Sequence, residues 1–364
     1  MNFDEFVKEM QENIKAYLPE WYENATVDVF QNQKLNDPYL GLQVKLPEQN
    51  IVPCINLDAM YETYKQGMDF KDIASKAADM ISTPAPELDT ASLKNYHAVK
   101  DRLFVKVSSA EKNAEILKNI PHTMMDDLAM TYHVLVQYDR NKGMASFTVS
   151  NAHMEMFGIS PEQLHADAMK STQEILPVTV EHLSEVMADS IRQKMLADGL
   201  PEEEIASYLE QMAIPEEADM LVVSNEIRTA GASAIFYPDV LDQVAEKAGG
   251  NFFILPSSTE EVLVLPDNGR MNYRELDAMV CEVNDAQVAE CEQLGNHVYH
   301  YDAEDKVFEK ASAYEARQAE KSKGRDTAKD KASIMKKLDD RKKEVRDNVK
   351  NTAVPVRVAS AELG

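Results

Sequence analysis

One arrangement occurs twice in this chain and constrains its fold more than any other feature: a strand, a tight turn, a second strand and then a helix. The two copies cover Ala129–Phe157 and Phe252–Val288. In each, short apolar stretches flank a polar turn. Because two antiparallel strands followed by a helix form a ββα unit, we predict an α+β fold with an antiparallel or mixed sheet and packed helices. A doubly wound nucleotide fold would need crossover helices and a glycine-rich first turn, which the sequence lacks.

Breaks in this pattern divide the 364 residues into three regions. A helix, three short strands and an interrupted helical stretch predict an N-terminal α+β subdomain at 1–81, followed by a proline-rich break at 82–90. The main α+β domain is predicted at 91–308. Inside it, residues 180–213 have the pattern of a helical hairpin insertion, broken at Gly199 and Pro201. Residues 310–364 are predicted to be a basic tail, partly helical or disordered.

Two local predictions in the main domain depend on apolar content and on helix breakers. Ala232–Phe236 is apolar and is predicted to be a strand, like the preceding Met220–Ser224. Ala110–Asn119 is predicted to be a helix that ends before Pro121.

The charge is distributed unevenly along the chain. The net charge is −25; residues 310–364 carry 15 Lys and Arg against 9 Asp and Glu, which leaves 23 against 54 in residues 1–309. The tail is therefore at +6 and the body at −31. An acidic body repels phosphates, which argues against direct nucleic-acid binding by the body. The alternatives for the acidity are solubility and, as a minor one, an acidic mimic of DNA that occupies a DNA-binding partner.

The sequence favours a cytoplasmic protein. Its three cysteines form no CxxC pair, so neither a disulfide framework nor a structural zinc site is predicted. The N-terminal stretch is an acidic amphipathic helix without a basic region and an apolar core, and no stretch approaches the length of a membrane span. No membrane association is expected.

Motifs that bind cofactors are absent from the sequence. It contains no GxxxxGK[ST], no GxGxxG and no HExxH, so no cofactor is predicted. His297 and His300 are three residues apart, which on a strand points them to opposite faces, so no metal site is predicted. Ser257 and Ser258 lack the flanking glycines of a nucleophile elbow, and a polar hairpin turn is favoured. No catalytic residue is assigned.

A candidate binding site can still be defined on two polar loops. Residues 224–231 and 256–261 each follow an apolar stretch, and polar loops on a rigid sheet often bind ligands. Two histidines could join them if the fold brings them close. The candidate binding residues are Asn225, Arg228, Thr229, Ser257, Ser258, Glu261, His122 and His300.

Several segments resemble a domain-of-unknown-function family whose members are common in Gram-positive gut bacteria and often lie near mobile genetic elements. The most specific are NIPH, TAGASAIFYPDVL, LPSS, EVN and HVYHYD, and the likeness covers about residues 1–308. The ββα layout also has a fainter likeness to another uncharacterised family. The resemblance implies a fold and a genomic setting but no activity. It also implies that a histidine is common where this chain has Glu260, so a role for that histidine is in doubt here.

Two classes of function remain. The favoured one is a non-enzymatic accessory or interaction protein that acts through contacts with an unknown protein partner, with a link to a mobile genetic element. The alternative is a hydrolase or a small-ligand-binding protein with its site at loops 224–231 and 256–261. A pocket that brings these loops together would favour the alternative.

Overall fold

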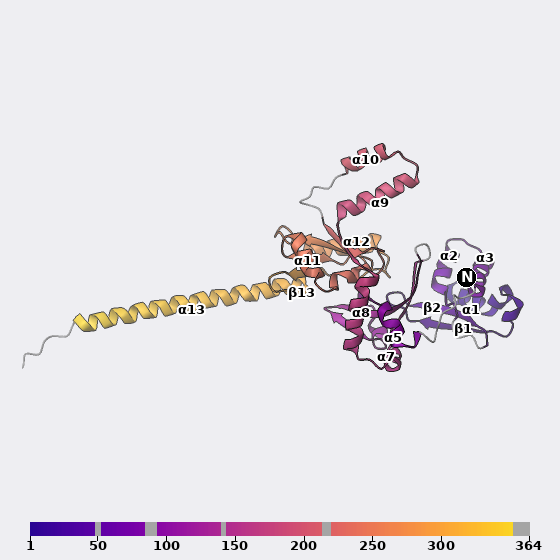
Figure 1. Cartoon of the computed structure of the whole chain (residues 1–364), viewed down its shortest axis with the longest axis horizontal. Helices are drawn as coiled ribbons and strands as arrows, with labels where there is room; N and C mark the ends of the chain where they lie inside the picture. Colours follow the sequence, from indigo (N-terminus) through magenta and orange to yellow (C-terminus); the bar gives the residue numbers. More distant parts are fainter. Residues whose placement is uncertain (48–51, 84–92, 140–142, 213–219, 352–364) are drawn as a thin grey trace, which may run out of the picture. The chain divides into compact units, whose positions relative to one another are not determined.

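The computed structural model describes residues 1–47, 52–83, 93–139, 143–212 and 220–351. The chain divides into two compact units, Met1–Lys310 and Ala311–Gly364. Every pairing between the described strands is antiparallel, and helices pack with the sheets, so the predicted α+β class is confirmed (Figure 1). The proline-rich break, the tip of the turn at 140–142 and the end of the tail after residue 351 lie outside the described residues.

The N-terminal part has its own sheet and its own apolar core. Asn2 caps the first helix in a capping box: its side chain accepts from the Glu5 amide, and the Glu5 side chain accepts from the Asn2 amide. Apolar residues of α1 and α3 on facing sides, such as Phe6 and Ile73, are fully buried in one cluster. The sheet has the order β1-β2-β3. The elements are α1 Phe3–Asn13, η1 Ile14–Tyr17, η2 Glu20–Tyr22, β1 Thr26–Asn32, β2 Tyr39–Lys45, β3 Ile55–Asn56, α2 Leu57–Lys65 and α3 Phe70–Ser82.

The second sheet is built around one long strand, β6. Its partner β4 pairs along Leu128–Val134, and β5 and then β7 pair with its successive halves. Ser150 and Ser160 cap the two helices that follow. The elements are α5 Tyr96–Val99, η3 Lys100–Arg102, β4 Leu103–Ser109, α6 Ala114–Leu117, β5 His122–Met125, β6 Leu128–Asp139, β7 Gly143–Thr148, α7 Asn151–Phe157 and α8 Pro161–Ile175.

The third sheet has six strands in the order β13-β12-β10-β11-β9-β8. The hairpin β10–β11 lies at its centre, with Ile254 opposite Val264. The elements are β8 Val178–His182, α9 Leu183–Ala197, α10 Glu202–Gln211, β9 Leu221–Asn225, η5 Gly231–Phe236, α11 Val240–Ala248, β10 Phe252–Leu255, β11 Val262–Pro266, α12 Tyr273–Gln287, β12 Tyr299–Asp302 and β13 Val307–Lys310.

One apolar core joins the second and third sheets. Strands β4 and β6 contribute every second residue to it, for example Val105 and Tyr132, and β9, β10 and β11 contribute residues such as Val223 and Val264. Helices α8 and α11 and the short helix η5 close the same cluster. Because only alternate residues of β4 and β6 enter this core, the other face of the second sheet is available for a different use.

Three local predictions were wrong. Ala232–Phe236 forms the 3₁₀ helix η5 and no strand; Ala230 enters it with φ of 55°, and all its residues are buried against the sheets, so the apolar run reflects burial alone. Of the helix predicted at 110–119, only α6 forms, and β5 follows it. The helical hairpin begins later than predicted, because Val178–His182 pairs with β9 as strand β8. The hairpin itself, α9 and α10, is seen in Figure 1.

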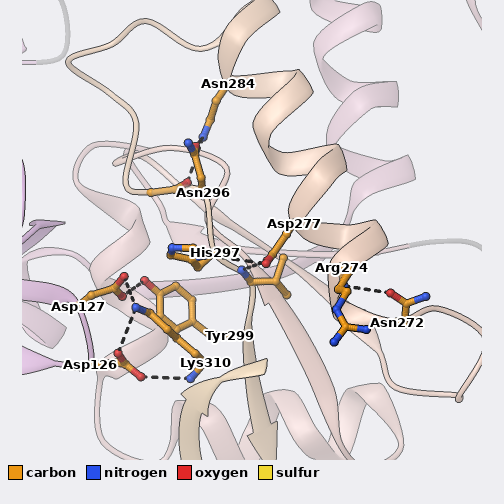
Figure 2. A network of polar contacts seen from close by, with 12 residues as sticks. Asp126, Asp127, Asn272, Arg274, Asp277, Asn284, Asn296, His297, Tyr299 and Lys310 are labelled. Carbon is orange, nitrogen blue, oxygen red and sulfur yellow. Dashed lines mark hydrogen bonds and ion pairs between the residues drawn. The ribbon is translucent and has the colours of Figure 1, made fainter. Parts of the chain in front are cut away.

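A polar network ties the last hairpin of the third sheet to the turn between β5 and β6 (Figure 2). The Tyr299 hydroxyl donates to Asp127 Oδ1 at 2.5 Å, and Lys310 Nζ lies 2.8 Å from Asp127 Oδ2. The Lys310 amide also donates to Asp126 Oδ2 at 3.2 Å. Burial opposes ionisation of Asp127, but its hydrogen bonds to Lys310 and Tyr299 outweigh burial and lower its pKa. The second and third sheets are therefore joined by these hydrogen bonds and ion pairs as well as by the shared apolar core.

The second unit contains one long charged helix, α13 Ala311–Asn351. Within the described parts of the chain, no helix is both long and apolar enough to cross a membrane.

Candidate functional site

A cavity of about 460 Å³ lies on the second face of the β4–β6–β7 sheet. The connection between β1 and β2, residues 32–37, forms one wall, and the turns around 229–230 and 259–260 form another. The Asn36 amide donates to Asn113 Oδ1 at 2.7 Å, and Leu35 packs beside Leu117, so the connection is held on the main sheet. The volume lies in the range of small-molecule sites.

The floor of the cavity is a sheet face that is polar although it is covered. Residues of β4 alternate: those at 103, 105 and 107 enter the apolar core, whereas Lys106 and Ser108 line the cavity. His133 of β6 and Thr148 of β7 continue the same face, because they lie opposite each other in register. Ser108 and His133 are only 2% and 3% exposed. A polar sheet face usually faces solvent, but here the segments at 32–37, 229–230 and 259–260 cover it.

The two predicted loops meet at the cavity. The Ser224 hydroxyl donates to the Glu260 carbonyl oxygen at 2.7 Å, and the Ala230 amide donates to Glu260 Oε2 at 2.7 Å. Gly231 makes this approach possible: a Cβ there would lie 2.1 Å from Ser224 Oγ and 2.2 Å from the Glu260 carbonyl oxygen. The glycine of TAGAS is therefore required for space.

The loop after β9 holds two non-glycine residues in the left-handed region, Arg228 at φ of 49° and Ala230 at φ of 55°. Thr229, between them, lines the cavity. Such conformations persist where the surroundings impose them, and they cluster at functional sites. The buried Asn225 holds the loop, because its amide donates to the Thr229 carbonyl oxygen at 2.9 Å.

Lys106 is the cation of the cavity floor. Its Nζ lies 5.5 Å from the centroid of the Phe104 ring, and it forms no ion pair with any carboxylate of the described residues. Burial lowers the pKa of Lys106; the charge of Glu260 opposes this shift, and that of Lys34 adds to it. A partly buried ammonium without an ion pair to a carboxylate of the described residues is a favourable position for a negatively charged ligand atom.

Ser108 is a second polar residue of the cavity that lacks a polar interaction partner among the described residues. Its hydroxyl is buried and, among the described residues, has no hydrogen-bond partner. Buried polar groups in folded proteins are nearly always hydrogen-bonded. Because Ser108 lies two residues after Lys106 on one strand, both side chains emerge on the same face.

Two further titratable groups with shifted pKa values line the cavity, the half-buried Glu260 and the buried His133. Burial raises the pKa of Glu260, against hydrogen bonds to the Ala230 amide and the Thr259 hydroxyl. Burial, with a smaller effect of the Lys106 charge, lowers the pKa of His133 well below its usual value. His133 Nε2 lies 3.0 Å from Thr131 Oγ1 and Nδ1 lies 3.3 Å from Thr148 Oγ1, so both ring nitrogens are engaged.

Of the candidate residues, only Thr229 lines the cavity. Asn225 organises its loop from inside. The Arg228 guanidinium lies 3.0 Å from Glu181 and 3.6 Å from Glu261, and none of these three residues lines the cavity. The loop after β9 therefore borders the cavity through Thr229, whereas the charged candidates Arg228 and Glu261 lie outside its lining.

The remaining candidates lie elsewhere. The Ser258 amide donates to the Glu261 carbonyl oxygen at 3.1 Å and its hydroxyl accepts from the Glu260 amide, as in a turn. Neither Ser257 nor Ser258 is hydrogen-bonded to a histidine among the described residues. His122 Nδ1 donates to the Ile120 carbonyl oxygen at 3.0 Å. His300 is fully buried and lies 3.1 Å from Asp267 Oδ2.

Four parts of the cavity were not predicted from the sequence: Lys106, Ser108, His133 and the wall at 32–37. A signal existed in LFVKVSS, where a lysine interrupts an apolar strand. The alternation looked like that of an ordinary half-exposed strand. In the described ranges, no group of three or more His, Cys, Asp or Glu side chains is arranged to hold a metal ion.

Fold and cavity together define an antiparallel α+β protein, with its described strands in three sheets and a polar cavity beside the second. The chain belongs to the Family of unknown function (DUF5688), whose family model matches residues 3–303. This confirms the family resemblance; the bacterial habitat and the mobile-element setting that it implied stay predictions. No curated protein and no solved structure matches the chain.

Proposed function

We propose that this protein binds a small polar molecule in the cavity formed by residues 32–37, the second face of the β4–β6–β7 sheet and the turns at 229–230 and 259–260. The Ser108 hydroxyl, which is buried and has no hydrogen-bond partner among the described residues, carries this proposal, because a polar atom of a ligand would satisfy it. The strained loop around Thr229 and the unpaired Lys106 ammonium support it. The cytoplasmic location predicted from the sequence belongs to the same proposal.

The exposed Cys291 at the cavity wall provides a direct test. The full chain is treated with iodoacetamide in the presence of metabolite mixtures, and peptide mapping follows the alkylation of each cysteine. A bound ligand should slow alkylation of Cys291 and leave that of Cys281, which does not line the cavity, unchanged.

Two matched variants identify the site. Ser146→Trp places a ring in the cavity and should abolish protection, whereas Ala145→Trp, at an exposed neighbour on the same strand, should preserve it. If no mixture slows Cys291 alkylation, or if Ser146→Trp leaves protection intact, the proposal is wrong.

A second candidate function, contact with a protein partner, is favoured by the surface of the α9–α10 hairpin. A groove of about 370 Å³ between the helices is lined mainly by apolar side chains, including Met187, Ile191 and Leu209. Residues 183–211 carry seven acidic and two basic side chains. We therefore propose a partner helix with an apolar face and basic flanks.

This candidate needs a variant that spares the fold. Met187 and Met212 are 41% and 44% exposed, so Met187→Asp combined with Met212→Asp should leave unfolding unchanged. Capture experiments with the full chain and with residues 1–309 should recover a partner that carries such a helix. Recovery of the same partner by the double variant would exclude this surface.

A further inference from the structure

We propose that the ligand of the cavity carries an oxyanion, a carboxylate or a phosphate, which pairs with Lys106 while Ser108 hydrogen-bonds another oxygen of the ligand. This inference rests on the proposed small-ligand function and specifies the chemistry that the cavity accepts.

Lys106 is a partly buried cation on the covered face of the sheet. A lysine on a covered sheet face normally has a carboxylate beside it, because desolvating an ammonium is unfavourable. Here Phe104 provides a ring at 5.5 Å and no ion pair is formed with the described residues. An anionic ligand would supply the missing counter-charge and would bind more strongly than in water, because the site is largely desolvated.

Hydrogen-bond donors other than Lys106 also lie on the cavity floor. Ser108 has a buried hydroxyl without a partner, two residues from Lys106 on the same strand, at a distance of about 7 Å along the strand. Thr148 and Ser146 add hydroxyls from β7 at the same floor. Lysine and serine are both donors to oxyanions, which have only acceptors to offer.

Two of the acidic side chains that line the cavity already have polar partners. Glu260 accepts from the Ala230 amide at 2.7 Å, and Asp37 lies 3.3 Å from Lys34. Glu292 also lines the cavity, and its backbone carbonyl accepts from the Thr259 amide. The sheet floor itself, where Lys106 lies beside Ser108, His133, Ser146 and Thr148, carries a positive charge, although the chain as a whole is acidic.

Calorimetric titration of the full chain with acetate and with inorganic phosphate tests the inference. At least one probe should bind, and which one binds distinguishes a carboxylate ligand from a phosphate ligand. Lys106→Met should weaken binding by about tenfold or more, the effect of losing one charged hydrogen bond. Lys118→Met, at an exposed lysine away from the cavity, should bind like the unmodified chain.

Stability separates loss of function from loss of fold. Because Lys106→Met removes a desolvated charge and keeps the length of the side chain, the variant should unfold at the same or a higher urea concentration. Weaker binding together with unchanged or raised stability supports the assignment. A variant that binds both probes as the unmodified chain does would overturn it.

The pH profile gives a readout that packing alone would not change. Acetate does not titrate at neutral or alkaline pH, so its affinity should fall as the pH rises through the lowered pKa of Lys106. Lys106→Arg, which stays charged, should hold its affinity to higher pH. The other charged or titratable groups facing Lys106 are Lys34, Asp37, His133, Glu260, Cys291 and Glu292. An identical profile for both chains would refute the role of Lys106.

Two failures can be told apart. If neither anion binds but a neutral metabolite protects Cys291 equally in the unmodified chain and in Lys106→Met, the cavity binds ligands and the oxyanion assignment is wrong. If nothing protects Cys291 and neither anion binds, the proposed function itself fails.

Discussion

Gly231→Ala should be strongly destabilising for reasons of space alone. The added Cβ would lie 2.2 Å from the Glu260 carbonyl oxygen and 2.1 Å from Ser224 Oγ, and the first of these is a backbone atom that cannot rotate away. Overpacking costs about 1–3 kcal/mol. Losing the hydrogen bond between Ser224 and Glu260 adds about 1 kcal/mol. We expect the free energy of unfolding to fall by about 2–4 kcal/mol.

Gly295→Ala is the matched control, because nothing lies within 4 Å of a Cβ built at Gly295. Its free energy of unfolding should change by less than about 0.5 kcal/mol. Urea unfolding followed by far-ultraviolet circular dichroism is the appropriate assay. Fluorescence of the single tryptophan, Trp21, would report on an exposed position in the N-terminal part instead. A Gly231→Ala variant as stable as Gly295→Ala would refute the reasoning, including the close approach of the two loops.

Three further predictions concern charge and pH. Because the folded-state pKa of Asp127 is lowered, its ionised side chain raises the free energy of unfolding above about pH 4, and this contribution is lost as the pH falls through the folded-state pKa. Asp127→Asn should remove this loss from the pH dependence of urea unfolding. An acid slope equal to that of the unmodified chain would contradict the prediction. Burial lowers the pKa of His133, so the free energy of unfolding should decrease as the pH falls below about 6.5, where only the unfolded chain takes up the proton. His133→Gln should reduce this dependence of the free energy of unfolding on pH. Equal slopes for the two chains would count against the prediction. Arg228→Ala should lower the free energy of unfolding by less than about 1 kcal/mol, since its ion pairs are exposed; a larger loss in the same assay would show that they matter more.

The sequence was sufficient to predict the elements whose signals are local. The hairpin at residues 252–266 was predictable because two apolar runs flank a short polar turn, and the helix after it was predictable because Asn272 and Glu275 form a capping box. The strand predicted at residues 232–236 was wrong because the signal there is not local. Their apolar character reflects complete burial, which a 3₁₀ helix and a strand share, and the left-handed Ala230 that starts the helix has no reliable sequence signal.

The candidate site was predictable only in part, because its walls come from distant segments. Loops 224–231 and 256–261 were recognised as polar turns on a sheet, and they do meet at Glu260. The cavity floor was missed because Lys106 and Ser108 look like the solvent face of β4 until residues 32–37 cover them. That covering depends on the Asn36 contact with Asn113, across 77 residues of sequence, and no local pattern encodes it.

The alternation along β4 also limits how this family can diversify. Odd positions from 103 to 107 build the hydrophobic core, and Lys106 and Ser108 line the cavity. Under the proposed ligand-binding function, substitution at position 106 or 108 should alter ligand preference without disturbing the core. A single inserted or deleted residue in β4 would exchange the two sets, exposing core residues to the cavity and placing Lys106 in the core. We therefore expect relatives with different ligands to differ at even positions of β4 while its length stays constant.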